Sequence, residues 1–137
     1  MAIIQTQIDT NSAEYQRNSE VMGAAVEEVR TIERRVVELA RSKEERYKKR
    51  GLLVPRERLT HLLDRGAPFL ELSTLCGYLQ EGDKDGSAAG GSCLTGLGYV
   101  QGTLCAILVD DYLTKGGSIT QLGSGKRRRM YELAMAH

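Results

Sequence analysis

Residues 93–117 constrain the fold of this chain more than any other part of its sequence. Two apolar runs, residues 94–100 and 103–109, are separated only by Gln101-Gly102. Each run has the length of a strand, and the glycine supplies the positive φ of a tight turn, so the stretch predicts a β-hairpin. The second run does not alternate between apolar and polar residues, which is typical of a strand covered on both faces. It ends in a charged loop containing glycine, where α/β proteins often place a binding site.

The charge balance of the chain argues against two classes of partner. Its 137 residues include 19 basic and 18 acidic side chains, for a net charge of +1. Binding to nucleic acid or to an anionic membrane needs a concentrated positive field, which this balance does not provide. Six tyrosines, one phenylalanine and no tryptophan are also too few for a surface that stacks nucleotide bases. We therefore expect no nucleic acid and no membrane among the partners.

The sequence shows neither a membrane span nor a secretory signal. No apolar run approaches the roughly 20 residues that cross a bilayer, and the first residues lack a basic segment followed by an apolar one. The cysteines, Cys76, Cys93 and Cys105, are odd in number and widely spaced, which predicts buried, reduced thiols and no metal site. We expect a cytoplasmic protein, or one of the mitochondrial matrix if its source is eukaryotic, although no transit peptide is visible.

The N-terminal part of the chain predicts an extended arm followed by a long helix. The arm covers residues 1–10, Asn11 can cap the helix with Glu14 completing a capping box, and Gly23 marks where the helix could break. One apolar stripe recurs at alternating steps of three and four residues. The stripe either packs on the parent protein or forms a coiled-coil arm, and about three heptads favour the first interpretation. It consists of Met22, Ala25, Val29, Ile32, Val36 and Leu39.

A second group of signals predicts a short helix and then a strand. The basic run 46–50 suits the last turn of the long helix, and Gly51 suits the left-handed position that follows it. Pro55 fits the first position of the next helix, and residues 65–66 end that helix. His61 lies within it, and we assign this histidine no chemistry. Residues 69–73 then predict a strand. The apolar face of the short helix comprises Leu59, Leu62 and Leu63.

The two remaining segments predict a loop and a C-terminal helix. Residues 81–92 hold four glycines without the ligand spacing of a calcium loop or the lysine of a P-loop, so we interpret them as a flexible connection. Two helical glycines would cost roughly 1 kcal/mol each. We therefore expect the last helix to start after Gly123, with Ser124 as its cap and residues 127–136 as its body. The chain ends within this helical pattern, which indicates a cut inside a domain.

Two short motifs carry candidate chemistry. Asp110-Asp111 ends the second hairpin strand, but adjacent residues of a strand point to opposite faces, so at most one of them faces a given site. A structural role as the polar end of a buried strand is at least as well supported. Lys115-Gly116-Gly117 can contact a phosphate-bearing ligand, because glycines let backbone donors approach closely. We assign no catalytic residue.

Three segments, in matching order and spacing, resemble carboxyltransferase (β) subunits of acyl-CoA carboxylases. They are residues 51–59 (GLLVPRERL), residues 66–73 (GAPFLELS) and residues 95–117. The sequence FLELS followed by Cys76-Gly77-Tyr78 is most similar to the methylcrotonyl-CoA and geranyl-CoA carboxylase branch. The bacterial acetyl-CoA type carries a four-cysteine zinc ribbon ahead of this region, whereas no cysteine here precedes Cys76.

The resemblance implies an α/β protein with a crotonase-like (ClpP/crotonase) fold, a superhelix of ββα units. Residues 1–66 would form an N-terminal helical arm, and residues 67–137 the truncated beginning of the N-terminal carboxyltransferase domain. Such subunits are biotin-dependent ligases that move a carboxyl group from carboxybiotin, carried on the biotin carboxylase/biotin carrier (α) subunit, to an acyl-CoA. The acceptor is a coenzyme A thioester that is deprotonated to an enolate, and the β subunits form a homo-oligomer.

The resemblance covers about the first quarter of a family member. The backbone donors that stabilise the enolate would lie beyond His137, and Lys115, Gly116 and Gly117 would lie near the acyl-CoA pocket. We therefore expect the isolated chain to be inactive and prone to self-association. The alternative is a non-catalytic assembly module with no activity of its own.

Overall fold

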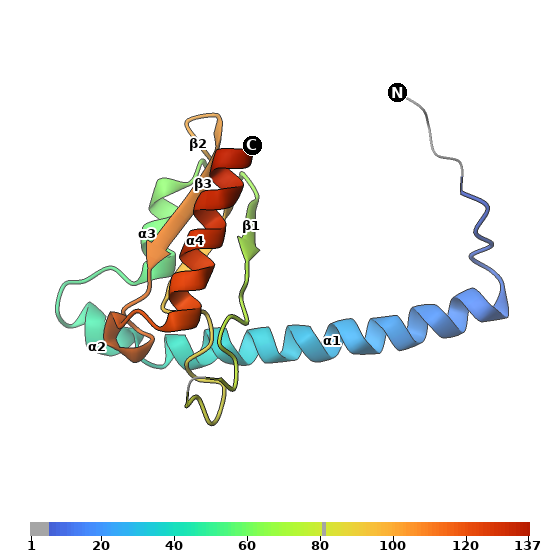
Figure 1. Cartoon of the computed structure of the whole chain (residues 1–137), viewed down its shortest axis with the longest axis horizontal. Helices are drawn as coiled ribbons and strands as arrows, with labels where there is room; N and C mark the ends of the chain where they lie inside the picture. Colours follow the sequence, from blue (N-terminus) through green and yellow to red (C-terminus); the bar gives the residue numbers. More distant parts are fainter. Residues whose placement is uncertain (1–5, 81) are drawn as a thin grey trace. The chain divides into compact units, whose positions relative to one another are not determined.

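The computed structural model describes residues 6–80 and 82–137 (Figure 1). The chain divides into two compact units, Met1–Arg34 and Arg35–His137. Helix α1 (Ala13–Arg41) begins in the first unit and ends in the second. All three strands and the helices α2, α3 and α4 belong to the second unit. Of the predicted N-terminal arm, residues 1–5 lie outside the described residues, and residues 6–9 form neither helix nor strand.

The start of α1 differs from the prediction. The Ser12 hydroxyl accepts a hydrogen bond from the Tyr15 N–H at 3.2 Å, so Ser12 caps the helix. Asn11 cannot do so, because it lies one residue earlier in a turn in which its own N–H donates to the Asp9 carboxylate. The helix also runs through Gly23 without a break, since a cost of roughly 1 kcal/mol is too small to interrupt a helix of good helix formers. The predicted Asn11 cap and the break at Gly23 are therefore wrong.

The apolar stripe of α1 is exposed from Met22 to Val29. Met22 is 65 % exposed and Val29 46 % exposed, whereas Ile32, Val36 and Leu39 are half-buried. The helix ends at Arg41, earlier than predicted.

The predicted glycine stop lies at the end of a separate helix, α2 (Glu44–Lys48). Gly51 has a φ of 71°, as predicted. Its N–H donates to the carbonyl of Lys48, and the next N–H donates to that of Tyr47. This pair of bonds is the Schellman arrangement that closes a helix, so the predicted role of Gly51 is confirmed.

Three antiparallel strands form one sheet in the order β1-β2-β3. They are β1 (Phe69–Leu72), β2 (Cys93–Val100) and β3 (Thr103–Asp110). The turn between β2 and β3 is Gln101-Gly102, with φ values of 50° and 76°, which is the type I′ geometry that matches strand twist. The Asp64 carboxylate accepts hydrogen bonds from both turn N–H groups, each at 2.7 Å. The hairpin is thus confirmed, and Asp64 is a support that the sequence analysis missed.

One face of the sheet packs on helix α3 (Pro55–Leu62), which begins with the predicted proline. Leu63 belongs to this core, but Leu62 is 48 % exposed, because the helix ends there and the next residue is extended. Gly96 leaves room for Phe69, since a Cβ on it would lie 2.4 Å from the Phe69 ring. The buried residues of this core are Leu59, Leu94, Ile107 and Val109.

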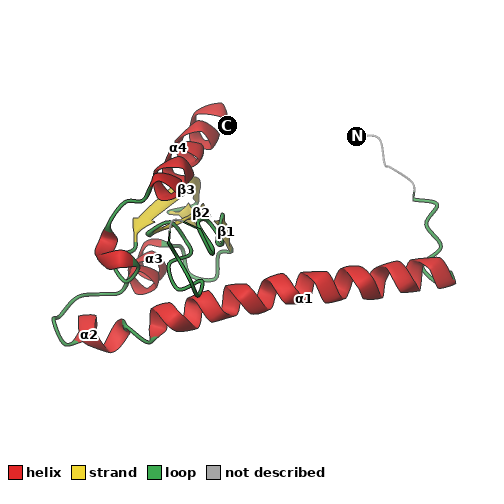
Figure 2. Cartoon of the chain, turned by 60° about the horizontal axis from the view of Figure 1, so that its bottom comes forward, coloured by secondary structure: helices red, strands yellow, loops and turns green. Residues whose placement is uncertain are grey.

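Helix α4 (Gln121–Ala136) lies on the other face. Asp110 stands opposite Cys93 in the register and pairs with Arg127 of α4 at 2.6 Å, whereas the neighbouring pair Leu94 and Val109 points to the α3 side. Figure 2 shows α3 and α4 on opposite sides of the sheet. This covering is partial, because Leu104, next to the hairpin turn, is 57 % exposed, whereas Ile107 and Val109 are buried. The prediction of a strand covered on both faces is therefore right only in part: a helix lies on each face of the sheet (Figure 2), but the residues of β3 next to the hairpin turn are exposed.

The glycines of α4 lie inside the helix, not before it. Thr120 is the cap, and its hydroxyl accepts from the Gly123 N–H at 3.0 Å. A Cβ on Gly123 would lie 2.3 Å from the carbonyl oxygen of Gly91, so the glycine allows the helix to approach the turn before β2. The predicted Ser124 cap is wrong, because this close packing outweighs the low helix propensity of glycine.

Candidate functional site

The acidic pair at the end of β3 has structural partners. Asp110 forms the ion pair with Arg127 described above. Asp111 accepts the Leu113 N–H at 2.8 Å through one carboxylate oxygen and the Thr114 hydroxyl at 3.1 Å through the other. The structural interpretation of Asp110-Asp111 is therefore supported, and Asp111 shapes the loop that follows.

That loop contains the three residues predicted to contact a ligand. Lys115, Gly116 and Gly117 form the short 3₁₀ turn η1 (Lys115–Gly117), with φ values of 46°, 65° and 84°. The Gly117 N–H donates to the Thr114 carbonyl at 2.9 Å. Such left-handed geometry is unfavourable for lysine but open to glycine, so this backbone depends on the residues around it.

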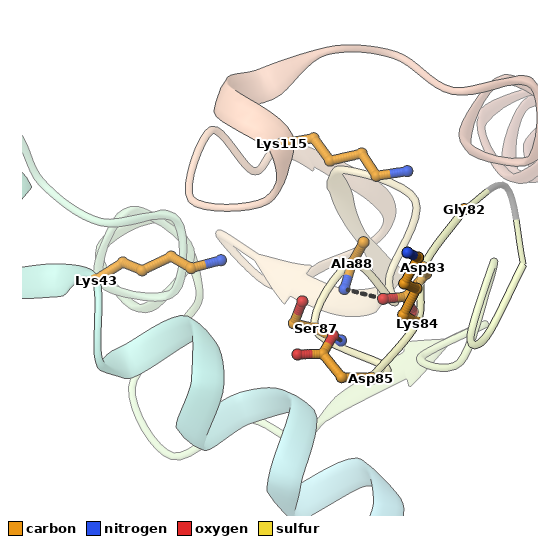
Figure 3. A pocket seen from close by; sticks show the side chains of 8 residues that line it. All are labelled: Lys43, Gly82, Asp83, Lys84, Asp85, Ser87, Ala88 and Lys115. Carbon is orange, nitrogen blue, oxygen red and sulfur yellow. Dashed lines mark hydrogen bonds between the residues drawn. The ribbon is translucent and has the colours of Figure 1, made fainter.

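Lys115 lies at the rim of a pocket of about 460 Å³ (Figure 3). The side chains of Lys43, from the turn between α1 and α2, and of Lys115 extend toward it from different sides. Segment 82–88 contributes the rest of the lining, including Lys84. Lys43 and Lys84 are distant in sequence from Lys115, and neither belongs to a motif, so sequence reasoning missed them.

Asp83 gives the segment 82–88 its shape. It is only 8 % exposed, and its two carboxylate oxygens accept the N–H groups of Leu79 at 3.1 Å and Ala88 at 3.2 Å. Hydrogen bonds from Ser87 hold the pKa of the exposed Asp85 carboxyl below its usual value. The predicted loop is confirmed for residues 82–92, and Glu81 lies outside the described residues. The loop is tied by buried hydrogen bonds and is not merely a connection.

A buried lysine of helix α4, Lys126, is hydrogen-bonded to the C-terminal end of the loop 82–92. Lys126 is 6 % exposed, and its Nζ donates to the carbonyls of Gly90 at 3.0 Å and Cys93 at 2.7 Å. Burial lowers the pKa of Lys126 and raises that of the Cys93 thiol. Lys126 thus anchors the turn that precedes β2.

The lining of the pocket carries a small excess of positive charge. Three ammonium groups and two carboxylates line it, and both oxygens of the Asp83 carboxylate already accept backbone N–H groups. Lysine ammonium groups are common phosphate contacts in proteins.

Three further observations bear on the other predicted site types. Cys76, Cys93 and Cys105 remain thiols, and of these Cys93 is fully buried. Across residues 6–80 and 82–137, no three metal-ligating side chains come together. The helices within those ranges are all too short or too polar to cross a membrane.

Comparison with known proteins identifies the family. The carboxyl transferase domain matches residues 46–137, more than half of the chain. The chain belongs to the carboxyl transferase domain family. The predicted resemblance is thereby confirmed, and the matched range contains the whole sheet, α3, α4 and most of the pocket. Helix α1 and Lys43 precede the range.

Individual members of the carboxyl transferase family extend the match to α1. The Drosophila melanogaster protein named probable methylcrotonoyl-CoA carboxylase beta chain, mitochondrial, is 37 % identical over 133 residues, which are 96 % of this chain and 23 % of that protein. The beta subunit of geranyl-CoA carboxylase from P. aeruginosa is 42 % identical with a TM-score of 0.84, over 96 % of this chain and 24 % of that one. The chain therefore spans about a quarter of the length of these relatives.

A more distant structure shares the fold. Transcarboxylase 12S has a TM-score of 0.69 at 23 % identity, covering 82 % of this chain and 23 % of that one. At this identity the likeness concerns architecture alone.

Proposed function

We propose that this chain is the N-terminal part of the carboxyltransferase (β) subunit of a biotin-dependent acyl-CoA carboxylase. The subunit transfers a carboxyl group from carboxybiotin to an acyl-CoA of the methylcrotonyl-CoA type. The observation that carries the proposal is the match to the geranyl-CoA carboxylase beta subunit over 96 % of this chain. The family match over residues 46–137 supports it.

Within this reaction the chain contributes substrate binding. Lys115, together with Lys43 and Lys84, neutralises phosphate charge of the coenzyme A thioester at the rim of the pocket. Gly116 and Gly117 let the backbone approach the ligand, because neither carries a side chain that would stand between them. This binding orients the acyl group, while the enolate is formed and stabilised by groups outside these residues.

The remaining parts of the proposal concern assembly. The ββα arrangement of β2, β3 and α4 is the first unit of a crotonase-like superhelix. The subunit works as a homo-oligomer with a biotin carboxylase/biotin carrier (α) subunit, and carboxybiotin reaches it as a substrate. Its compartment is the cytoplasm, or the mitochondrial matrix in a eukaryote.

One observation favours a second candidate function, a non-catalytic assembly module. The exposed stripe of α1, with Met22 65 % and Val29 46 % exposed, lies ahead of the matched family range. An exposed apolar stripe on a helix is typical of an interaction surface.

A chimera separates the two functions. This chain replaces the matched segment of the P. aeruginosa beta subunit, which is assembled with its own partner and assayed for carboxylation of geranyl-CoA. We expect activity within about tenfold of the parent, and none from the 137-residue chain alone. A folded, assembled chimera without activity would refute the carboxyltransferase proposal and leave the assembly module. A control chimera with Gly117→Val should assemble but bind acyl-CoA poorly.

A further inference from the structure

The turn at Lys115-Gly116-Gly117 has a backbone that needs outside support. All three residues have positive φ, and that of Lys115 is 46°. This conformation brings the lysine Cβ close to the following carbonyl oxygen, so it persists only where neighbouring structure holds it. The turn lines the pocket through Lys115, so whatever holds it also positions part of the site.

Two tyrosines clamp the chain just before this turn. The Tyr47 hydroxyl donates to the main-chain carbonyl of Tyr112 over 3.1 Å, and the two rings lie 4.9 Å apart, tilted by 49°. The Tyr112 hydroxyl donates in turn to the carbonyl of Leu53. Segment 47–53 therefore donates one hydrogen bond to Tyr112 and accepts another from it. Neither side can move away without breaking a hydrogen bond.

Tyr112 also contacts the turn directly. A Cβ on Gly117 would lie 3.3 Å from the Cβ and 3.4 Å from the Cα of Tyr112, so Gly117 packs against it. In the stretch between Tyr112 and Gly117, the Leu113 N–H and the Thr114 hydroxyl both donate hydrogen bonds to the Asp111 carboxylate. The position of Tyr112 thus sets both the start of the turn and the surface on which its last residue rests.

We propose that Tyr47 and Tyr112 form a latch that holds Lys115-Gly116-Gly117 in its left-handed conformation and thereby sets the affinity of the pocket for acyl-CoA. The second half of this statement rests on the function proposed above. The residues that line the pocket include neither tyrosine. Both are positioning residues, which act through the turn and do not contact the substrate.

Phenylalanine variants test the latch, because each removes one hydroxyl and keeps the ring. Tyr47→Phe and Tyr112→Phe are compared with Tyr131→Phe, whose side chain is 60 % exposed on α4. In the 137-residue chain, NMR measures the exchange with water of the Gly117 and Ser118 N–H groups, with that of Ile107 in the core as the reference. We expect exchange in the turn to be about fivefold faster in each latch variant, the effect of losing one hydrogen bond. Ile107 and the control variant should be unchanged.

In the complete subunit encoded by the reading frame, assembled with its biotin-carrying partner, the KM for acyl-CoA should rise by a similar factor while kcat stays within twofold. Exchange in the turn at the wild-type rate in both variants would overturn the latch. So would an equal acceleration at Ile107, which would indicate loss of overall stability. If kcat fell at constant KM, the tyrosines would not act through substrate affinity. A wild-type subunit without carboxylation would refute the proposed function, and with it the substrate half of this inference. The exchange rates would still decide whether the tyrosines hold the turn.

Discussion

Gly123→Ala and Gly125→Ala should change stability in opposite directions, although both place alanine in the same helix. Alanine is favoured over glycine in a helix by roughly 1 kcal/mol. At Gly125 a Cβ meets no atom within 4 Å, so the whole gain should appear. At Gly123 it would lie 2.3 Å from the Gly91 carbonyl oxygen, which is backbone and cannot rotate away. Overpacking typically costs 1–3 kcal/mol, and we expect a net loss of about 2 kcal/mol.

Thermal unfolding and urea unfolding, both followed by circular dichroism, compare the two variants with the parent chain. One kcal/mol corresponds to about 4–8 °C in Tm for a domain of this size. We therefore expect Gly123→Ala to lower Tm by about 10 °C and Gly125→Ala to raise it by about 5 °C. If the two variants changed Tm in the same direction and by the same amount, helix propensity and not close packing would explain Gly123. An unchanged slope of the free energy against urea would show that the denatured state is the same in all three proteins.

Three further predictions concern charged residues. Asp64→Ala leaves both hairpin-turn N–H groups without their carboxylate, and we expect the free energy of unfolding to fall by about 2 kcal/mol; an unchanged urea midpoint would contradict this. Lys126→Met removes the donor to two buried carbonyls and should cost about 2 kcal/mol or more near neutral pH. Because burial lowers the pKa of Lys126 from 10.5, the unfolded chain binds more protons between that lowered pKa and 10.5. The stability difference between parent and Met variant should therefore widen as pH rises through this window, and a narrowing difference would oppose the assignment. In the complete subunit, Lys43→Met and Lys115→Met should each weaken coenzyme A binding about tenfold at low salt, whereas Arg128→Gln on α4 should not. If calorimetry gave the same affinity for coenzyme A in both lysine variants and the parent, neither lysine would contact the ligand.

Local signals in the sequence were sufficient for several elements. The two residues Gln101-Gly102 between apolar runs predict the hairpin, because only a tight turn with positive φ fits there. Pro55 and Gly51 likewise mark one helix start and one helix end through their own backbone preferences. In each case the deciding interaction lies within a few residues along the chain.

Contacts between distant segments account for two of the wrong predictions. The Ser124 cap was predicted from propensity, but the fold brings Gly123 against Gly91, which lies 32 positions earlier. Leu104 is exposed because it lies next to the hairpin turn, and the apolar run alone does not tell how much of a strand the helices cover.

In the candidate site, too, local sequence predicts some residues, and others come together only in the folded chain. Lys115-Gly116-Gly117 could be singled out because lysine and glycines adjoin in sequence. Lys43 joins Lys115 only through the folded chain. Asp83 is not part of any apolar or helical repeat in the sequence. Its role in shaping the loop comes from hydrogen bonds that its carboxylate accepts from two backbone N–H groups.

We propose that this chain belongs to an acyl-CoA carboxylase that transfers carboxyl groups from biotin. The most direct measurement uses the complete subunit with its biotin-carrying partner, ATP and radiolabelled bicarbonate. We predict acid-stable label in the carboxylated product of methylcrotonyl-CoA or of a similar acyl-CoA, and no such label when avidin sequesters biotin. A folded, assembled complex that carboxylates its biotin but transfers no label to any acyl-CoA would contradict the account.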